Sequence, residues 1–179
     1  RFVGANDSAA GTAAVLELSR ALARSLPAAH REIRFVLFDG EEEAAHCKPF
    51  IECGLRGSKA YAAAHSGEIG QMILLDYIAN KGLRIPRELN SDQVLWSKLR
   101  DAANQVGAGD VFLGGSAAAA ILDDHIPFIE AGVPSIDLID FSYRYKDTNE
   151  DTVDKLSEAA LDAVGESVTQ LVISISAPG

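Results

Sequence analysis

The chain has 179 residues, of which 47% are hydrophobic, and this length allows one globular domain with a substantial core. Its 26 acidic and 16 basic residues give a net charge of −10, which disfavours nucleic acid or an acidic membrane surface as a partner. No apolar run approaches the roughly 20 residues that span a bilayer, and the chain does not open on a basic-then-apolar signal segment. We therefore expect a peptide, a small molecule or a metal ion as partner, and no membrane insertion.

Helical and strand-like patterns alternate along the chain. Apolar residues recur at helical spacing in residues 11–26, and a strand-like, β-branched run follows at residues 32–38. Further helices are predicted at 56–65, 91–106, 126–131 and 152–173, and further strands at 70–78 and 133–139. This alternation predicts an α/β fold: a three-layer sandwich in which helices flank both faces of a mostly parallel, mixed β-sheet.

Acidic residues lie at the ends of the predicted strands. The run at residues 32–38 leads into Glu41 and Glu42. The second strand contains Asp76, and the third contains Asp137. Ligands of such sheets bind beyond the carboxyl ends of the strands, so we expect these acids to gather at one edge. Like charges repel there unless some acids are protonated or a cation is bound.

The stretch GANDSAAG at residues 4–11 precedes the first helix. Asn and Asp are favoured in turns and helix caps, and a metal-binding role for Asp7 is the alternative. Glu41 and Glu42 are adjacent, so in an extended segment their side chains point to opposite sides. One could bind a cation while the other acts as a general base, although a solvated acidic loop explains the pair as well.

Three further stretches carry acids. Asp76 lies in the apolar run ILLDYI, where a carboxylate is costly to bury unless it is paired, protonated or metal-bound. The run ILDDHIPF places Asp123, Asp124 and His125 before a Pro-containing helix start, and capping accounts for only part of this set. Asp147 precedes the last helix, in a region that also fits an ordinary helix cap.

The two cysteines, Cys47 and Cys53, are close in sequence. Their spacing permits a small disulfide, which would indicate a secreted or periplasmic protein, and two free thiols in a reduced cytosol fit nearly as well. A zinc knuckle would need more Cys or His ligands than the neighbouring His46 supplies.

In order, the motifs resemble a known family. GANDSAAGTAAVLELSRAL, FDGEE, GLRGS, LLD, DDHIPF, AGVP and a final DT are similar to the zinc-dependent exopeptidases, which include bacterial aminopeptidases and animal-type glutaminyl cyclases. FVGANDSA, the insertion between GEE and GLRGS, and DDHIPF resemble the cyclase branch more. The resemblance implies a phosphorylase/hydrolase-like fold. We expect residues 1–179 to form a single catalytic domain that lacks the family's N-terminal strands.

The resemblance also implies roles for the acids. Asp7 and Glu42 would be zinc ligands, and Glu41 would be the proton shuttle. In cyclases Asp76 would share a proton with Asp123 beside the substrate amine. In aminopeptidases Asp76 would instead bind a second zinc ion, so the family implies one zinc ion or two.

The chain departs from the family pattern near its last motif. Asp147, in the stretch KDTNEDT, stands where the family has its last ligand, a histidine. With Asp7 and Glu42 it would place three negative charges around an ion with two positive ones, which favours harder ions such as Mg, Mn or Ca. Lys146 and Asp137 stand where cyclases usually have Trp and His.

Three functions are consistent with these features. The first is a glutaminyl-peptide cyclotransferase, which forms pyroglutamate at peptide N-termini. The alternative is a metallo-aminopeptidase that hydrolyses the first peptide bond. The third is a catalytically impaired homologue, because Asp147 replaces the histidine ligand.

Overall fold

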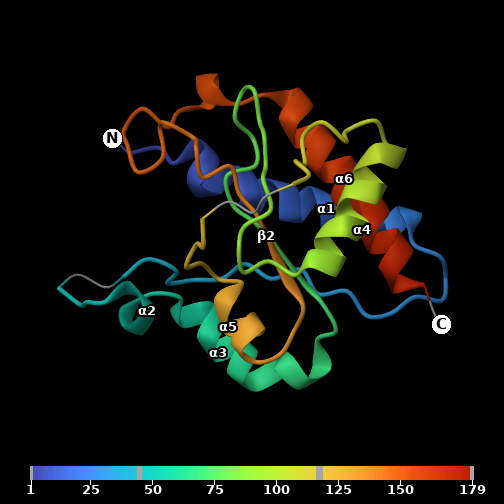
Figure 1. Ribbon diagram of the computed structural model, residues 1–179, viewed down its shortest axis with the longest axis horizontal. Helices are drawn as coiled ribbons and strands as arrows, with labels where there is room; N and C mark the ends of the chain where they lie inside the picture. The colour runs from blue at the N-terminus through green and yellow to red at the C-terminus, as the bar shows by residue number, and fades with distance from the viewer. Residues whose placement is uncertain (1, 44–45, 116–118, 178–179) are drawn as a thin grey trace.

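A small parallel sheet lies at the centre of the molecule. The computed structural model describes residues 2–43, 46–115 and 119–177 (Figure 1). Strand β1 (Met72–Leu75) pairs in parallel with β2 (Ser135–Leu138), with Leu74 opposite Asp137. Because parallel neighbours need a crossover, the long segment between them carries helices, as predicted.

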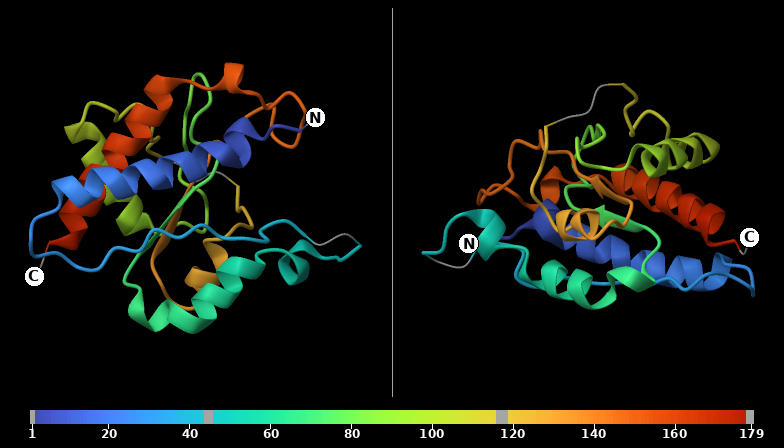
Figure 2. Two further views of the ribbon diagram at one scale, coloured as in Figure 1. Left: turned by 180° about the vertical axis from the view of Figure 1, so that it is seen from behind. Right: turned by 60° about the horizontal axis from the view of Figure 1, so that its bottom comes forward.

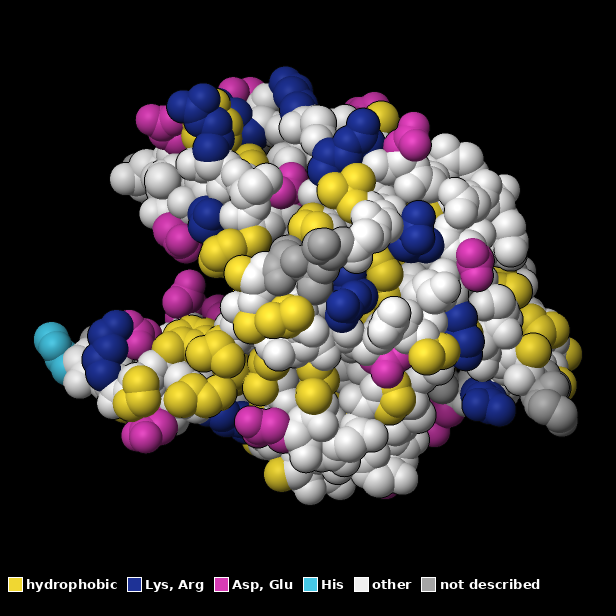
Figure 3. Space-filling model, in the orientation of Figure 1, with side chains coloured by type: hydrophobic (Ala, Val, Ile, Leu, Met, Phe, Trp, Pro, Cys, Tyr) yellow, Lys and Arg dark blue, Asp and Glu magenta, His cyan; other side chains and the backbone are white. Residues whose placement is uncertain are grey.

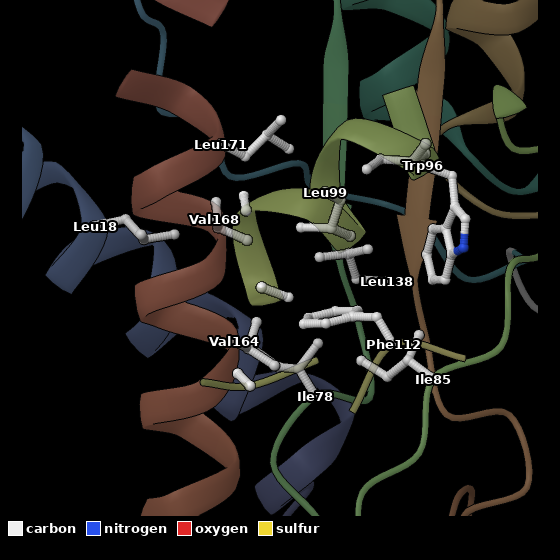
Figure 4. Packing of buried hydrophobic residues seen from close by; sticks show 14 of the residues in the cluster. Leu18, Ile78, Ile85, Trp96, Leu99, Phe112, Leu138, Val164, Val168 and Leu171 are labelled. Carbon is white, nitrogen blue, oxygen red and sulfur yellow. The ribbon is translucent and has the colours of Figure 1, made fainter. Parts of the chain in front are cut away.

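Three helices cover one face of this sheet. They are α1 (Gly11–Ser25), α4 (Gln93–Gln105) and α6 (Glu158–Ser176). Leu18, Leu99 and Leu171, one from each helix, belong to a buried cluster that also contains Ile136 and Leu138 of β2 (Figure 4). This cluster is the main hydrophobic core.

The opposite face is covered by two shorter helices, α3 (Arg56–His65) and α5 (Ile126–Glu130), as the views in Figure 2 show. Phe128 of α5 packs against Phe38, with ring centroids 5.8 Å apart, and against Ala62 of α3. Helices on both faces of a parallel sheet confirm the predicted α/β class.

The helix ends follow the capping residues. α4 begins two residues later than predicted, after Asp92, whose side chain caps it by accepting a hydrogen bond from Leu95 N at 2.7 Å. α6 begins after Ser157, six residues later than predicted. The residues before it form a 3-10 turn, η3 (Val153–Lys155), followed by a bridge between Leu156 and Asn80.

The described residues also form three short helical elements. They are η1 (Ala5–Ala10), α2 (Phe50–Cys53) and η2 (Ser66–Glu68). α2 lies on an arm, residues 40–43 and 46–55, that leaves the body of the molecule (Figure 1). Within the described part of the chain, no helix combines the length and the apolar character needed to cross a membrane.

The predicted strand at residues 32–38 is wrong. The segment is extended but belongs to no strand ladder. It runs along a cavity that separates it from β1, so its amide and carbonyl groups do not reach that strand. A local β pattern produces a strand only where a partner lies within hydrogen-bonding distance.

Candidate functional site

A cavity of about 1260 Å³ opens beside the carboxyl end of β1. Figure 3 shows a notch at the left of the molecule, with acidic side chains on its walls. The arm with α2 forms one side of this notch, and the N-terminal region with the loop before α6 forms the other. All six predicted catalytic and metal-binding residues line the cavity: Asp7, Glu41, Glu42, Asp76, Asp123 and Asp147.

The turn that carries Glu41 and Glu42 is fixed by the start of α3. Leu55 N donates to Glu41 O at 2.7 Å, and Arg56 N donates to Gly40 O at 3.0 Å. The Arg56 guanidinium donates to Glu42 O at 2.8 Å. The motifs FDGEE and GLRGS, which are separate in sequence, therefore form one backbone-paired unit that holds both glutamates at the cavity.

Asp7 is held in place by another acid. Asp151, which is fully buried, accepts hydrogen bonds from the backbone N–H groups of Asn6 and Asp7 at 3.0 Å and from the Tyr143 hydroxyl at 2.7 Å. The Asp7 side chain is left free to face the cavity, where the Tyr77 hydroxyl donates to it at 3.5 Å. Asp151 therefore orients the turn, while Asp7 presents its carboxylate.

Asp76 and Asp123 both line the cavity, and each carboxyl group affects the pKa of the other. Burial, together with the charges of Asp123 and Asp137, raises the pKa of Asp76 well above its ordinary value. Burial also raises the pKa of Asp123, to about 6. Two neighbouring buried carboxyls resist losing both protons, so Asp76 and Asp123 are suited to share one proton.

The remaining cavity acids are coupled by repulsion. Burial raises the pKa of Glu41 to about 8, and the charges of Asp123 and Glu42 add to the effect. Burial and the charge of Asp147 raise the pKa of Asp7 to about 6. Glu41 is thus protonated or readily protonated near neutral pH, as a proton-transferring group requires.

Asp147 lies at the exposed rim of the cavity. It follows Lys146, whose ammonium lies 4.4 Å from the centre of the Phe141 ring and donates to Phe141 O. Asp147 has φ of 59°, a left-handed conformation that aspartate tolerates better than most residues. The rim therefore combines one acid, one base and an exposed aromatic ring.

The roles of the expected zinc ligands stay a prediction. Asp7, Glu42 and Asp147 line one cavity, and their charges raise the pKa of Asp7. Across residues 2–43, 46–115 and 119–177, however, no three His, Cys, Asp or Glu side chains are grouped so that they could hold a metal ion. An all-carboxylate set with more negative charge than a divalent cation neutralises also suits zinc poorly.

The arm beside the cavity carries the two cysteines. The structure joins Cys47 and Cys53 in a disulfide. The Arg56 guanidinium donates to Cys53 O as well as to Glu42 O, both at 2.8 Å. The disulfide loop and the glutamate turn are therefore tied to the same side chain.

Sequence reasoning missed several residues of this region. Tyr77, whose hydroxyl donates to Asp7, directly follows Asp76 in the motif LLDY, and this position beside a predicted site residue could have indicated its role. Asp124, which accepts a hydrogen bond from Ser58, adjoins the predicted Asp123. Asp151 gave no local signal of its role, because Asn6 and Asp7, the residues that it orients, lie about 145 residues away.

Comparison with known proteins points to one family. The model of "Peptidase family M28" matches residues 2–172. Aminopeptidase YwaD of Bacillus subtilis is 30% identical over 94% of this chain and 37% of its own length. The glutaminyl-peptide cyclotransferase of the snake Boiga irregularis is 28% identical over 96% of this chain and 55% of its own.

A solved structure of a glutaminyl cyclase has a similar fold. The chain superposes on an Acidobacteriales bacterium glutaminyl cyclase with a TM-score of 0.83 and 31% identity, over 98% of this chain and 63% of that one. The chain thus spans less than two thirds of the length of each of these proteins.

Proposed function

We propose that this chain, which belongs to peptidase family M28, acts on peptide N-termini as a glutaminyl-peptide cyclotransferase. The observation that carries the proposal is the cavity that Glu41, Asp76 and Asp123 line together, where burial raises the pKa of each carboxyl group. A pair that shares a proton suits an amine-binding acid network, whereas a metal-binding Asp76 would have to be deprotonated. We further propose that residues 1–179 act as a single catalytic domain.

The carboxyl groups suffice to describe the proton movements. The Asp76–Asp123 pair carries one negative charge, which would bind the substrate α-amine and orient it. The amine nitrogen attacks the side-chain carbonyl carbon of the N-terminal glutamine, and the bond to the side-chain nitrogen breaks. Glu41 accepts the proton that the amine loses and passes it to the departing ammonia, so the products are a pyroglutamyl peptide and ammonia.

Zinc, which the family resemblance implies, is proposed to bind only weakly at Asp7, Glu42 and Asp147. The three carboxylates carry more negative charge than one zinc ion neutralises, and harder divalent ions are favoured by such a set. A secreted or periplasmic location is proposed as well, because the Cys47–Cys53 disulfide would persist there.

An aminopeptidase is the second candidate. The 30% identity to aminopeptidase YwaD favours it, and in that case Asp76 would bind a second metal ion. A catalytically impaired homologue is the third, favoured by Asp147 in place of the family's histidine.

The test compares two substrates on the purified protein. Metal content is measured first, and then ammonia release from a glutaminyl peptide and hydrolysis of a leucyl anilide are assayed with and without chelator. Ammonia release alone supports the cyclotransferase. Anilide cleavage with two metals per chain supports the aminopeptidase, and no turnover of either substrate supports the impaired homologue.

A matched pair of variants assigns the activity to the site. Glu41→Gln removes the proton-transferring carboxyl and should abolish ammonia release. Glu52→Gln makes the same chemical change at an exposed position of α2 and should leave the rate unchanged. Equal rates for Glu41→Gln and the unmodified protein would exclude the proposed role of Glu41.

A further inference from the structure

Glu88 is a buried acid that lies outside the cavity and that the proposed reaction does not use. It lies in the chain segment between Ile85 and the start of α4, and it is fully buried. Its Oε1 accepts hydrogen bonds from Asn90 N at 2.9 Å and Ile121 N at 3.0 Å. Its Oε2 accepts from Ser91 N at 2.8 Å, from the Ser91 hydroxyl at 3.1 Å and from His125 Nε2 at 3.1 Å.

The partners of Glu88 lie on both sides of Asp123. One carboxylate oxygen holds the backbone of Ile121, two residues before Asp123, and the other holds the imidazole of His125, two residues after it. Ile126 N also donates to Asp123 O at 2.9 Å, which closes the turn onto α5. Glu88 thus holds the acid-bearing turn, residues 121–125, at two points.

The same network reaches the sheet. The Ser91 hydroxyl donates to Glu88 and accepts from Asp137 N of β2 at 3.0 Å. His125 Nδ1 faces the other end of the network, 3.9 Å from Asp137 Oδ2, and both side chains are fully buried. The turn with Asp123 is therefore positioned relative to β2, the strand that neighbours β1 and Asp76.

The network depends on the negative charge of Glu88. Five donors converge on its two oxygens, and a buried carboxylate tolerates loss of its charge poorly when backbone N–H groups would be left unpaired. Burial opposes ionisation of Glu88, but the hydrogen bonds from His125, Asn90 and Ile121 outweigh it and lower the pKa to about 2. His125 Nε2 therefore carries the hydrogen in its bond to Glu88.

We propose that Glu88 and His125 are positioning residues that hold the turn at residues 121–125 so that the Asp123 carboxyl stays against Asp76. This inference deepens the proposed function, because the Asp76–Asp123 pair would bind the substrate amine only in that arrangement. Asp151 provides a parallel: it is also buried, also accepts several hydrogen bonds, and fixes the turn that presents Asp7.

The kinetic test is a double-mutant cycle with a glutaminyl peptide. Glu88→Gln should lower kcat/KM by at least about tenfold, because small displacements of positioned groups cost rates of this order. Glu130→Gln, an exposed change on α5, should have no effect. In a background that already carries Asp123→Asn, Glu88→Gln should change kcat/KM less than about twofold, because the residue it positions is gone.

A purely structural role of Glu88 predicts a different result. The two substitutions would then act independently, and their effects on kcat/KM would multiply. Such multiplicative effects, measured under conditions where each variant is folded, would overturn the proposal.

A crystal structure of the Glu88→Gln variant separates this inference from the proposed function. The distance between the Asp76 and Asp123 carboxyls should be larger than in the unmodified protein. If the unmodified protein releases no ammonia, the proposed function fails, and this distance still decides the positioning role. An unchanged distance would overturn it, and His125→Leu, which removes the donor at the other side, replaces Glu88→Gln if that variant does not fold.

Discussion

The stability of the protein should depend on the charge of Glu88. Its pKa of about 2 lies well below the ordinary value of 4.5. Each pKa unit corresponds to about 1.4 kcal/mol, so the ionised form contributes about 3 kcal/mol to the free energy of unfolding at neutral pH. Glu88→Gln keeps the shape of the side chain but removes the charge, and it should therefore lower this free energy by about 3 kcal/mol at pH 7.

The pH dependence of this loss distinguishes a charge effect from a packing effect. A group with a lowered pKa contributes stability that is present above its unfolded pKa and is lost as the pH falls through its folded pKa. The difference between the unmodified protein and Glu88→Gln should be constant from pH 7 to about pH 5. By pH 3 it should fall to less than half, and it should vanish below about pH 2.

Urea unfolding at pH 7, 5 and 3 measures these differences. Glu130→Gln, the same change at an exposed site, should shift the free energy of unfolding by less than about 0.5 kcal/mol at each pH. A difference for Glu88→Gln that is the same at pH 5 and pH 3 would refute the reasoning, because a defect of packing does not titrate.

Three further changes test other parts of the structure. Asp147→His should tighten zinc binding in calorimetry, because a neutral imidazole replaces one of three carboxylates, and unchanged affinity would mean that Asp147 is not a ligand. Burial raises the pKa of Glu41 from 4.5 to about 8. The stability that neutral Glu41 contributes is therefore fully present below about pH 4.5 and is lost as the pH rises through 8. Metal-free protein should therefore lose stability between pH 5 and pH 9, and a slope in thermal unfolding that Glu41→Gln leaves unchanged would contradict this. Gly57→Ala would place a Cβ 2.4 Å from Asp39 O and should lower the free energy of unfolding, measured in urea, by about 1–3 kcal/mol. Gly67→Ala, with open space around it, should have little effect. Equal losses of stability in the two variants would argue against the contact.

The sequence predicted the elements that are specified locally. α3 begins and ends where its pattern places it, and α1 differs by a single residue at its end. The gathering of acids at one cavity was also predicted, and Asp76 follows β1 and Asp7 precedes α1, whereas Glu41 follows residues 32–38, which form no strand. These features follow from periodicity and capping, which a single segment contains.

Pairing across the chain could not be predicted in this way. Residues 32–38 have the composition of a strand, but a strand also needs a partner at hydrogen-bonding distance, and local composition does not supply one. The start of α6 was predicted too early, because the 3-10 turn and the bridge from Leu156 to Asn80 depend on a distant segment.

The acids of this protein divide into two kinds by their hydrogen bonds. Glu88 and Asp151 are fully buried and accept several hydrogen bonds from backbone N–H groups, which in Glu88 stabilise the charged form. Glu41 and Asp76 face the cavity, and burial and neighbouring charges raise the pKa of each. The first kind fixes the backbone, and the second kind has a raised pKa that suits proton exchange. The residue type is the same in both, so the difference arises only when folding brings the donors to one acid and withholds them from another.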